Sequence, residues 1–234
     1  MSPQASSNAD GTPSTGTPFV CSWSGGKDAT LALDRALRAG GDLRFLFTMM
    51  AEGGERSRSH GLRRDLLATQ AERLNVSWRR FEASWESYEE TFVEALSLFR
   101  DEGVEEGVFG DLDVEAHRTW VEGACKRAGL APRFPLWKRS RSSLFAAWRD
   151  RGFRGVVIAV RDGVLPRRLL GRSVDDDLFR EIRALGADAS GEAGEYHTLV
   201  TGGPPFSETI GIETGEAVLR DGVWFLDVRV EGDP

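Results

Sequence analysis

The short polar stretch Ser24-Gly25-Gly26-Lys27-Asp28 carries the residue types that bind phosphate. It follows an apolar run, residues 19–23, that indicates a buried strand, and it precedes apolar residues at helical spacing. A glycine-rich turn before a helix directs several backbone N–H groups at one point, and the helix dipole adds about half a positive charge there. Lys27 would add a full charge. The alternative is a plain turn, with Lys27 exposed and Asp28 capping the helix.

Two further stretches, residues 110–122 and 191–198, combine charged groups, hydroxyls and aromatic rings. Their candidate side chains and glycines are Gly110, Asp111, Arg118, Trp120, Glu122, Glu192, Glu195, Tyr196, His197 and Thr198. Paired carboxylates can hold a cation and move protons. From the residues alone, residues 191–198 could equally be a plain polar loop, and the i,i+4 spacing of Arg118 and Glu122 favours a helix-surface ion pair.

His60 lies in a loop after the second apolar run, where a histidine is usually just exposed. The three histidines are too scattered to predict a metal site by their spacing. No dedicated metal-ligand set is therefore expected.

The composition favours a globular protein with one large domain or two small ones. The chain has 234 residues, of which 40% are hydrophobic and 29% charged. The net charge of -7 argues against nucleic acid as the principal partner. Cys21 and Cys125 form no CxxC pair, so a reducing, cytoplasmic location is expected. No apolar run reaches membrane-spanning length, so we expect no membrane association.

The alternation of strand-like and helix-like stretches predicts an α/β fold, with a parallel twisted sheet covered by helices on both faces and a smaller α+β C-terminal domain. Residues 1–18 are expected to be a disordered tail, residues 19–131 the first domain and residues 132–234 the second, beginning with an extended connector. Asp221-Gly222 predicts a hairpin near the end. Because ligands bind beyond the carboxyl ends of parallel strands, Ser24, the segment after Met50 and Gly110-Asp111 should converge on one cleft.

Together these stretches resemble the diphthine ammonia ligase family of ATP pyrophosphatases, which carry an SGGKDS pyrophosphate-binding loop (PP-loop). The matching pieces are SGGKD at Ser24, His60 with QAERL at Gln70, FGDL at Phe109, HRTWVEGAC at His117, PLW at Pro135 and GEAGEYHTLV at Gly191. They run from Phe19 to about Phe206, and the tail beyond carries no assigned motif. Ala29 departs from the pattern, because the family has a serine there and one hydroxyl is missing.

The resemblance implies an adenine nucleotide alpha-hydrolase-like first domain and an ATP-dependent amide ligase of diphthamide biosynthesis. A carboxylate attacks the α-phosphate of ATP, pyrophosphate leaves, and ammonia displaces AMP. The implied ATP-binding residues are Ser22, Trp23, Ser24, Gly25, Gly26, Lys27, Asp28, Ala29, Thr30, Met49, His60, Gly110 and Asp111. Mg²⁺ is expected to accompany ATP.

The resemblance also implies catalytic roles for Lys27, Glu192 and Glu195, with the two carboxylates binding ammonium and removing its proton. The implied substrate-binding residues are Arg118, Trp120, Glu122, Glu192, Glu195, Tyr196, His197 and Thr198. Trp120, Trp137 and Tyr196 would cradle a trimethylammonium group such as diphthine carries, although core packing is the alternative for Trp137.

Three functions stay open at this point. The first is amidation of diphthine in elongation factor 2, and the second is the same chemistry on a small carboxylate in a bacterium, for example in corrinoid salvage. The third is a non-catalytic ATP-binding sensor, which the missing hydroxyl at Ala29 favours. The chain has no length for a glutaminase domain, so free ammonia is the expected nitrogen source. A homo-oligomer is compatible with each function.

Overall fold

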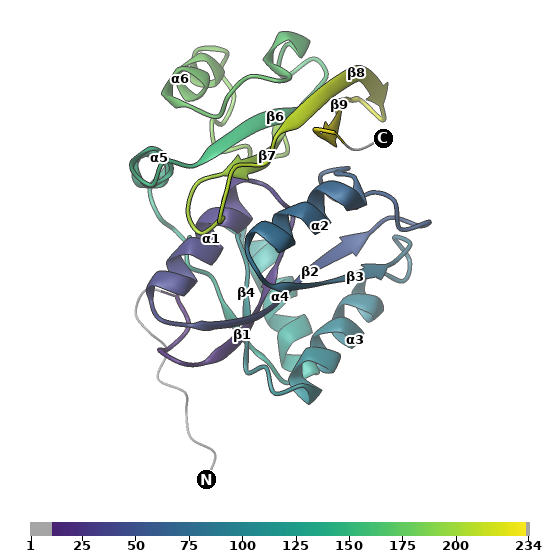
Figure 1. Ribbon diagram of the computed structural model, residues 1–234, viewed down its shortest axis with the longest axis vertical. Helices are drawn as coiled ribbons and strands as arrows, with labels where there is room; N and C mark the ends of the chain where they lie inside the picture. Colours follow the sequence, from purple (N-terminus) through teal and green to yellow (C-terminus); the bar gives the residue numbers. More distant parts are fainter. Residues whose placement is uncertain (1–10, 233–234) are drawn as a thin grey trace. The chain divides into compact units, whose positions relative to one another are not determined.

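The structure is a computed structural model that describes residues 11–232, and these residues form two compact units (Figure 1). Of the described residues, the first unit contains 11–23, 28–52 and 76–138, and the second contains 24–27, 53–75 and 139–232. Two short segments of the predicted first domain, residues 24–27 and 53–75, therefore make most of their contacts within the second unit.

The first unit is built on a five-stranded parallel sheet with the order β3-β2-β1-β4-β5. Its strands are β1 (Pro18–Ser22), β2 (Asp42–Met50), β3 (Ser77–Glu82), β4 (Glu106–Val108) and β5 (Ala131–Arg133), and α1 (Lys27–Arg38), α3 (Tyr88–Asp101) and α4 (Glu115–Ala128) follow β1, β3 and β4. The chain moves outward from β1 to β3 and then crosses back to β4, so right-handed crossovers place α1 on one face and α3 and α4 on the other. The predicted parallel α/β sheet is confirmed. The strand order reverses between β1 and β4, which is where open sheets of this kind bind ligands.

Large apolar side chains fill the face that α3 and α4 cover. Phe92 and Phe99 of α3 pack against Phe47 of β2, with ring centroids 5.5 and 5.7 Å apart. Cys125 of α4 is fully buried in the same cluster. Strand β5 was expected to be an extended connector; its proline, Pro132, is accommodated because β5 is an end strand of the sheet.

Residues 11–17 do not form part of a disordered tail, as the composition had suggested for residues 1–18. The Gly16 N–H donates to the Gly40 carbonyl at 2.8 Å, the Asp42 N–H donates to the Thr17 carbonyl at 2.9 Å, and Thr12 is buried. Backbone hydrogen bonds, which composition does not register, hold this segment. Residues 1–10 of the predicted tail lie outside the described residues.

The second unit contains a four-stranded antiparallel sheet with the order β7-β6-β9-β8. Its elements are α2 (Arg64–Arg73), α5 (Arg141–Asp150), β6 (Arg154–Arg161), a short 3-10 helix (Arg167–Leu169), α6 (Asp176–Ala184), β7 (Tyr196–Gly202), β8 (Ile212–Arg220) and β9 (Val223–Val230). Phe145 of α5 stacks on Phe179 of α6 with ring centroids 4.0 Å apart. The predicted hairpin is present, and its turn residues Asp221 and Gly222 have φ values of 49° and 76°.

Among the residues described, we find no helix with the length and apolar character needed to cross a membrane.

Candidate functional site

The glycine-rich loop between β1 and α1 is held by hydrogen bonds to other segments of the second unit. The Gly25 carbonyl accepts hydrogen bonds from the Val200 N–H at 2.9 Å and from Nε2 of Gln70 at 3.0 Å. Gly25 has a φ of 77°, and a Cβ there would lie 2.7 Å from Oε1 of Gln70. A Cβ on Gly26 would lie 2.6 Å from Cε1 of His60. A side chain at either position would therefore displace Gln70 or His60, and Gly25 is also favoured by its left-handed backbone conformation.

Gln70 is a site residue that the sequence placed only within a family motif. It is completely buried on α2, and its Nε2 donates to the carbonyls of both Gly25 and Val200, at 3.0 and 2.7 Å. It thereby joins the loop to β7. A signal was available, because Gln70 lies on the same helix face as the buried Leu66 and Leu67, where an amide needs a specific partner.

Lys27 is buried, with 9% of its surface exposed, and is surrounded by the segment that precedes and begins β7. Its N–H donates to Oγ1 of Thr198 at 3.0 Å, and its Nζ donates to the Ser190 carbonyl. The same Nζ lies 5.3 Å from the centre of the Tyr196 ring. The structure thus brings together three of the predicted site residues, Lys27, Tyr196 and Thr198. It adds Ser190, which the sequence did not single out.

Two histidine rings lie against each other beside the loop, tilted by 44°. The rings of His60 and His197 have centroids 4.4 Å apart, and Nδ1 of His60 lies 3.0 Å from the Ser24 carbonyl. Because a carbonyl only accepts, we assign the proton of His60 to Nδ1. Burial lowers the pKa of His197 to about 2, and the positive charges of His60, Lys27 and Arg161 add to the effect. His197 is therefore neutral at physiological pH.

Glu195 is the buried carboxylate of this region. Only 8% of its surface is exposed, and its Oε2 makes no hydrogen bond within the described part of the chain. A buried carboxylate oxygen without a donor is unfavourable, so this position favours a bound cation or a hydrogen-bond donor. The other predicted carboxylate, Glu192, is half-buried.

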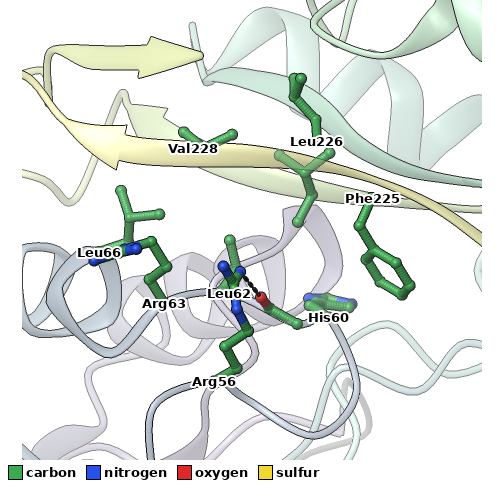
Figure 2. Close-up of a pocket in the computed structure, with 10 residues that line it drawn as sticks. Arg56, His60, Leu62, Arg63, Leu66, Phe225, Leu226 and Val228 are labelled. Atoms are coloured by element: carbon green, nitrogen blue, oxygen red, sulfur yellow. Dashed lines mark hydrogen bonds between the residues drawn. The ribbon is translucent and has the colours of Figure 1, made fainter. Parts of the chain in front are cut away.

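A small recess borders His60 within the second unit (Figure 2). Leu62 and Leu66 line it from the start of the α2 region, and Phe225 and Val228 line it from β9. Two arginines add polar groups: Arg56 donates to the Gly61 carbonyl at 3.0 Å and to Asp227 at 2.9 Å, and Arg63 pairs with Asp65 at 3.1 Å. The recess is thus an apolar hollow whose arginines are already paired with neighbouring carboxylates.

In the first unit, Gly110 lies against the start of α1. A Cβ there would come within 3.0 Å of the Ala29 nitrogen, so only glycine allows this approach. Burial raises the pKa of the Asp111 carboxyl, the charge of Asp28 raises it further, and His117 opposes both effects. A Cβ on Gly110 would also lie 3.0 Å from the carbonyl carbon of Asp28, so the chain segments that carry the predicted carboxylates Asp28 and Asp111 approach each other here.

The remaining predicted ATP-site residues of this unit are Ser22 at the end of β1, Trp23 directly after it, Thr30 on α1 and Met49 on β2. Ser22 is half-buried, and the other three are buried.

The aromatic residues that were expected to receive a cation are already engaged. The Arg118 guanidinium lies 4.8 Å from the centre of the Trp137 ring, and Nζ of Lys138 lies 5.6 Å from it. Trp120 packs against Phe92, with ring centroids 4.9 Å apart. Arg118 also pairs with Glu122 at 2.7 Å, which is the i,i+4 ion pair that the spacing favoured.

The predicted cleft therefore divides into two observed groups. Within the second unit, the loop lies with His60, Tyr196, His197 and Thr198, and within the first unit Gly110 and Asp111 lie beside Asp28 and Ala29. The convergence of Ser24 with Gly110-Asp111 involves residues of both units and stays a prediction.

Comparison with known proteins gives two domain matches. The diphthamide synthase N-terminal domain matches residues 19–132, and the diphthamide synthase C-terminal domain matches residues 141–230. The similarity thus reaches residue 230, well beyond the limit near Phe206 that the motifs suggested. The β8–β9 hairpin belongs to the C-terminal domain.

The diphthine--ammonia ligases of Rattus norvegicus and Homo sapiens are 30% and 28% identical to this chain over 144 residues, which are 59% of this chain and 54% of each relative. The Schizosaccharomyces pombe enzyme is 32% identical over 117 residues, which are 48% of this chain and 19% of that protein. The chain thus spans about half the length of the mammalian relatives that it matches.

A solved structure, described as a predicted subunit of tRNA methyltransferase from Methanocaldococcus jannaschii, covers 81% of this chain and 99% of its own, with a TM-score of 0.44 and 16% identity. That resemblance is too loose to bear on function. The two domain matches together cover most of the described residues, and the chain belongs to the diphthamide synthase family.

Proposed function

We propose that this protein is an ATP-dependent amide ligase. It would transfer AMP from ATP to a carboxylate, releasing pyrophosphate, and then replace AMP with ammonia to form an amide. The observation that carries this proposal is the loop of residues 24–27, whose carbonyls are tied to Gln70, Val200 and His60 at the start of a helix. With its carbonyls held in this way, the loop is ordered before any phosphate arrives.

Lys27 would contact the phosphate that leaves. Its ammonium group has three donors, one of which is directed to the Ser190 carbonyl, and it lies on the first turn of α1. Charge develops on pyrophosphate as its bond to the α-phosphate breaks, and a preorganised cation stabilises that charge most in the transition state. The Thr198 hydroxyl holds the Lys27 backbone in place.

The residues of the first unit fit the Mg²⁺ that usually accompanies ATP. Asp28 and Asp111 offer carboxylate oxygens, and Mg²⁺ commonly binds one or two carboxylates together with phosphate oxygens and water. The raised pKa of Asp111, caused by burial and by the charge of Asp28, favours a cation at this pair. Bound Mg²⁺ would neutralise phosphate charge.

Glu195 would receive the nitrogen donor. Its buried Oε2 has no hydrogen-bond partner among the described residues, and an ammonium ion would supply both the donor and the opposite charge. Transfer of a proton to Glu195 would then release free ammonia for attack on the acyl-adenylate.

The acceptor is either diphthine, for which the curated relatives are named, or another carboxylate. Cations of the chain itself already face Trp137 and Tyr196, which weakens the proposed trimethylammonium cradle and favours the second candidate, a small carboxylate.

Exchange of labelled pyrophosphate into ATP tests these alternatives. The exchange should require an acceptor, and we would offer diphthine-bearing elongation factor 2 and a panel of small carboxylates separately. Tight ATP binding without exchange for any acceptor would contradict the ligase proposal and favour a nucleotide sensor.

The role of Glu195 has its own test. Glu195→Gln should retain ATP binding and acceptor-dependent exchange but lose most amide formation, because adenylation precedes ammonia attack. Ala193, which lies between Glu192 and Glu195 and is exposed, offers a control: the variant Ala193→Ser should leave amide formation unchanged. Full amide formation by Glu195→Gln would assign the proton transfer to another group.

A further inference from the structure

The sheet of the second unit has two end strands, β7 and β8, which differ in the hydrogen bonds on their outer sides. Along β7, the Val200 N–H donates to the Gly25 carbonyl at 2.9 Å, and the Ile210 N–H donates to the Thr201 carbonyl at 2.7 Å. At the other end, β8 pairs with β9 on one side, and its residues 213–220 are exposed or half-buried. β8 therefore presents an outer row of backbone donors and acceptors, which is a template for another strand.

β8 is also unusually apolar for an open edge. Val218 is 42% exposed and Leu219 is 44% exposed, and because successive residues alternate, the two side chains lie on opposite faces. The strand is nine residues long and contains neither proline nor lysine, two residues that commonly blunt exposed edges. Its pairing with β9 shifts register between Thr214 and Ala217, so the regular part of this edge next to the turn is residues 217–220. Apolar groups on both faces of that regular part favour pairing.

The hairpin determines which residues of β8 face outward. Arg220 and Val223 flank a two-residue turn, which places them in a hydrogen-bonded pair, and Val218 and Phe225 occupy the next such position. Ala217, between these positions, therefore turns its N–H and C=O toward the open side, and so does Leu219. A strand that adds antiparallel to this edge must place its own outward-facing residues opposite them.

We propose that β8 pairs antiparallel with β8 of a second copy of this chain and that the protein is a homodimer through this edge. When Ala217 lies opposite Leu219 of the second copy, the hydrogen-bonding residues match. In that register Val218 lies opposite its own counterpart, and Glu216 lies opposite Arg220 at both ends.

The segment 216–220, with the sequence EAVLR, is thus its own complement about a two-fold axis, with an apolar centre and an ion pair at each end. This self-complementarity is what identifies the occupant as a second copy. Since the other end strand, β7, carries hydrogen bonds from elsewhere in the chain, the pairing closes at two copies.

Sedimentation velocity of the full chain over a range of concentrations tests the dimer. Val218→Lys would place two ammonium groups face to face on the axis, and it should shift the dimer dissociation constant upward by at least about tenfold. The matched control is Leu98→Lys, because Leu98 is 50% exposed on α3. The control should leave the dissociation constant unchanged.

Charge reversal tests the register. Glu216→Arg and Arg220→Glu should each weaken the dimer, and the double variant should restore it, because the ion pairs are then present in the opposite orientation. Circular dichroism and thermal unfolding of each variant would establish that it is folded. A monomer at every concentration, a fibre, or a dimer insensitive to Val218→Lys would each overturn the proposal, and failure of the double variant to recover would overturn its register.

Discussion

Gln70 gives the sharpest test of how the glycine-rich loop is held. Gln70→Leu removes two hydrogen bonds, those from Nε2 to the carbonyls of Gly25 and Val200. Each is worth about 1 kcal/mol net, and the Val200 carbonyl loses a donor at a buried position, so the free energy of unfolding should fall by about 2 to 3 kcal/mol. The Gly25 carbonyl keeps the Val200 N–H, so the loop should loosen rather than collapse.

Urea unfolding would measure the loss, with an unchanged m-value indicating that the folded and unfolded states are otherwise alike. Equilibrium dialysis with ATP would report on the loop, and affinity should fall together with stability because the loop must be ordered again on binding. The matched control is Glu72→Leu, at an exposed position of the same helix. If Gln70→Leu were as stable as this control, the two hydrogen bonds of Gln70 would contribute nothing to the free energy of unfolding.

Three further outcomes follow from the same region and from the core. Gly26→Ala should weaken ATP binding by at least about tenfold, since its Cβ would lie 2.6 Å from the His60 ring, and calorimetry should detect partial recovery when His60→Ala is added. His197 has a folded-state pKa far below its value of 6.5 in the unfolded chain, so the unfolded state binds the extra proton and stability should fall as pH decreases below about 6.5, by up to about 1.4 kcal/mol per pH unit. In urea unfolding at several pH values, His197→Asn should reduce the loss of stability below about pH 6.5. An unchanged pH dependence would mean that His197 is not the group responsible. Burial raises the pKa of Cys125 to about 12 and that of Cys21 further, so neither thiol should react with a thiol reagent until the protein unfolds, and rapid labelling of the native state would contradict the buried core.

Local patterns predicted most of the secondary structure. The apolar run before Ser24, the turn at Asp221-Gly222 and the apolar stripe of α3 each depend on neighbours in sequence, and the structure has a strand, a hairpin and a helix there. The prediction was wrong where a few long-range contacts decide. Residues 11–17 look disordered by composition, yet hydrogen bonds to Gly40 and Asp42 order them, and β5 depends on pairing with β4.

The candidate site shows the same limit. The residue types at 24–28 and 191–198 indicated phosphate and cation chemistry because those groups are the ones able to perform it. The buried helix face of Gln70 indicated that its amide needs a partner but not that this partner is the loop. No sequence pattern predicted that the Ser190 carbonyl would accept from Lys27 or that the Arg118 guanidinium would lie over the Trp137 ring. Gly25 and Gln70, Lys27 and Ser190, and Arg118 and Trp137 are each far apart in sequence, so only the packed fold selects these partners.

The sequence by itself determined the fold class, the glycine loop at the start of α1 and the family, because each depends on the order and type of nearby residues. The tertiary structure decided which groups are buried and what they contact. It made His197 neutral, left Oε2 of Glu195 without a donor among the described residues, and closed one edge of the second sheet while leaving β8 exposed. Burial and long-range pairing set the free energy of a charge or a hydrogen bond, and these are properties of the folded chain as a whole.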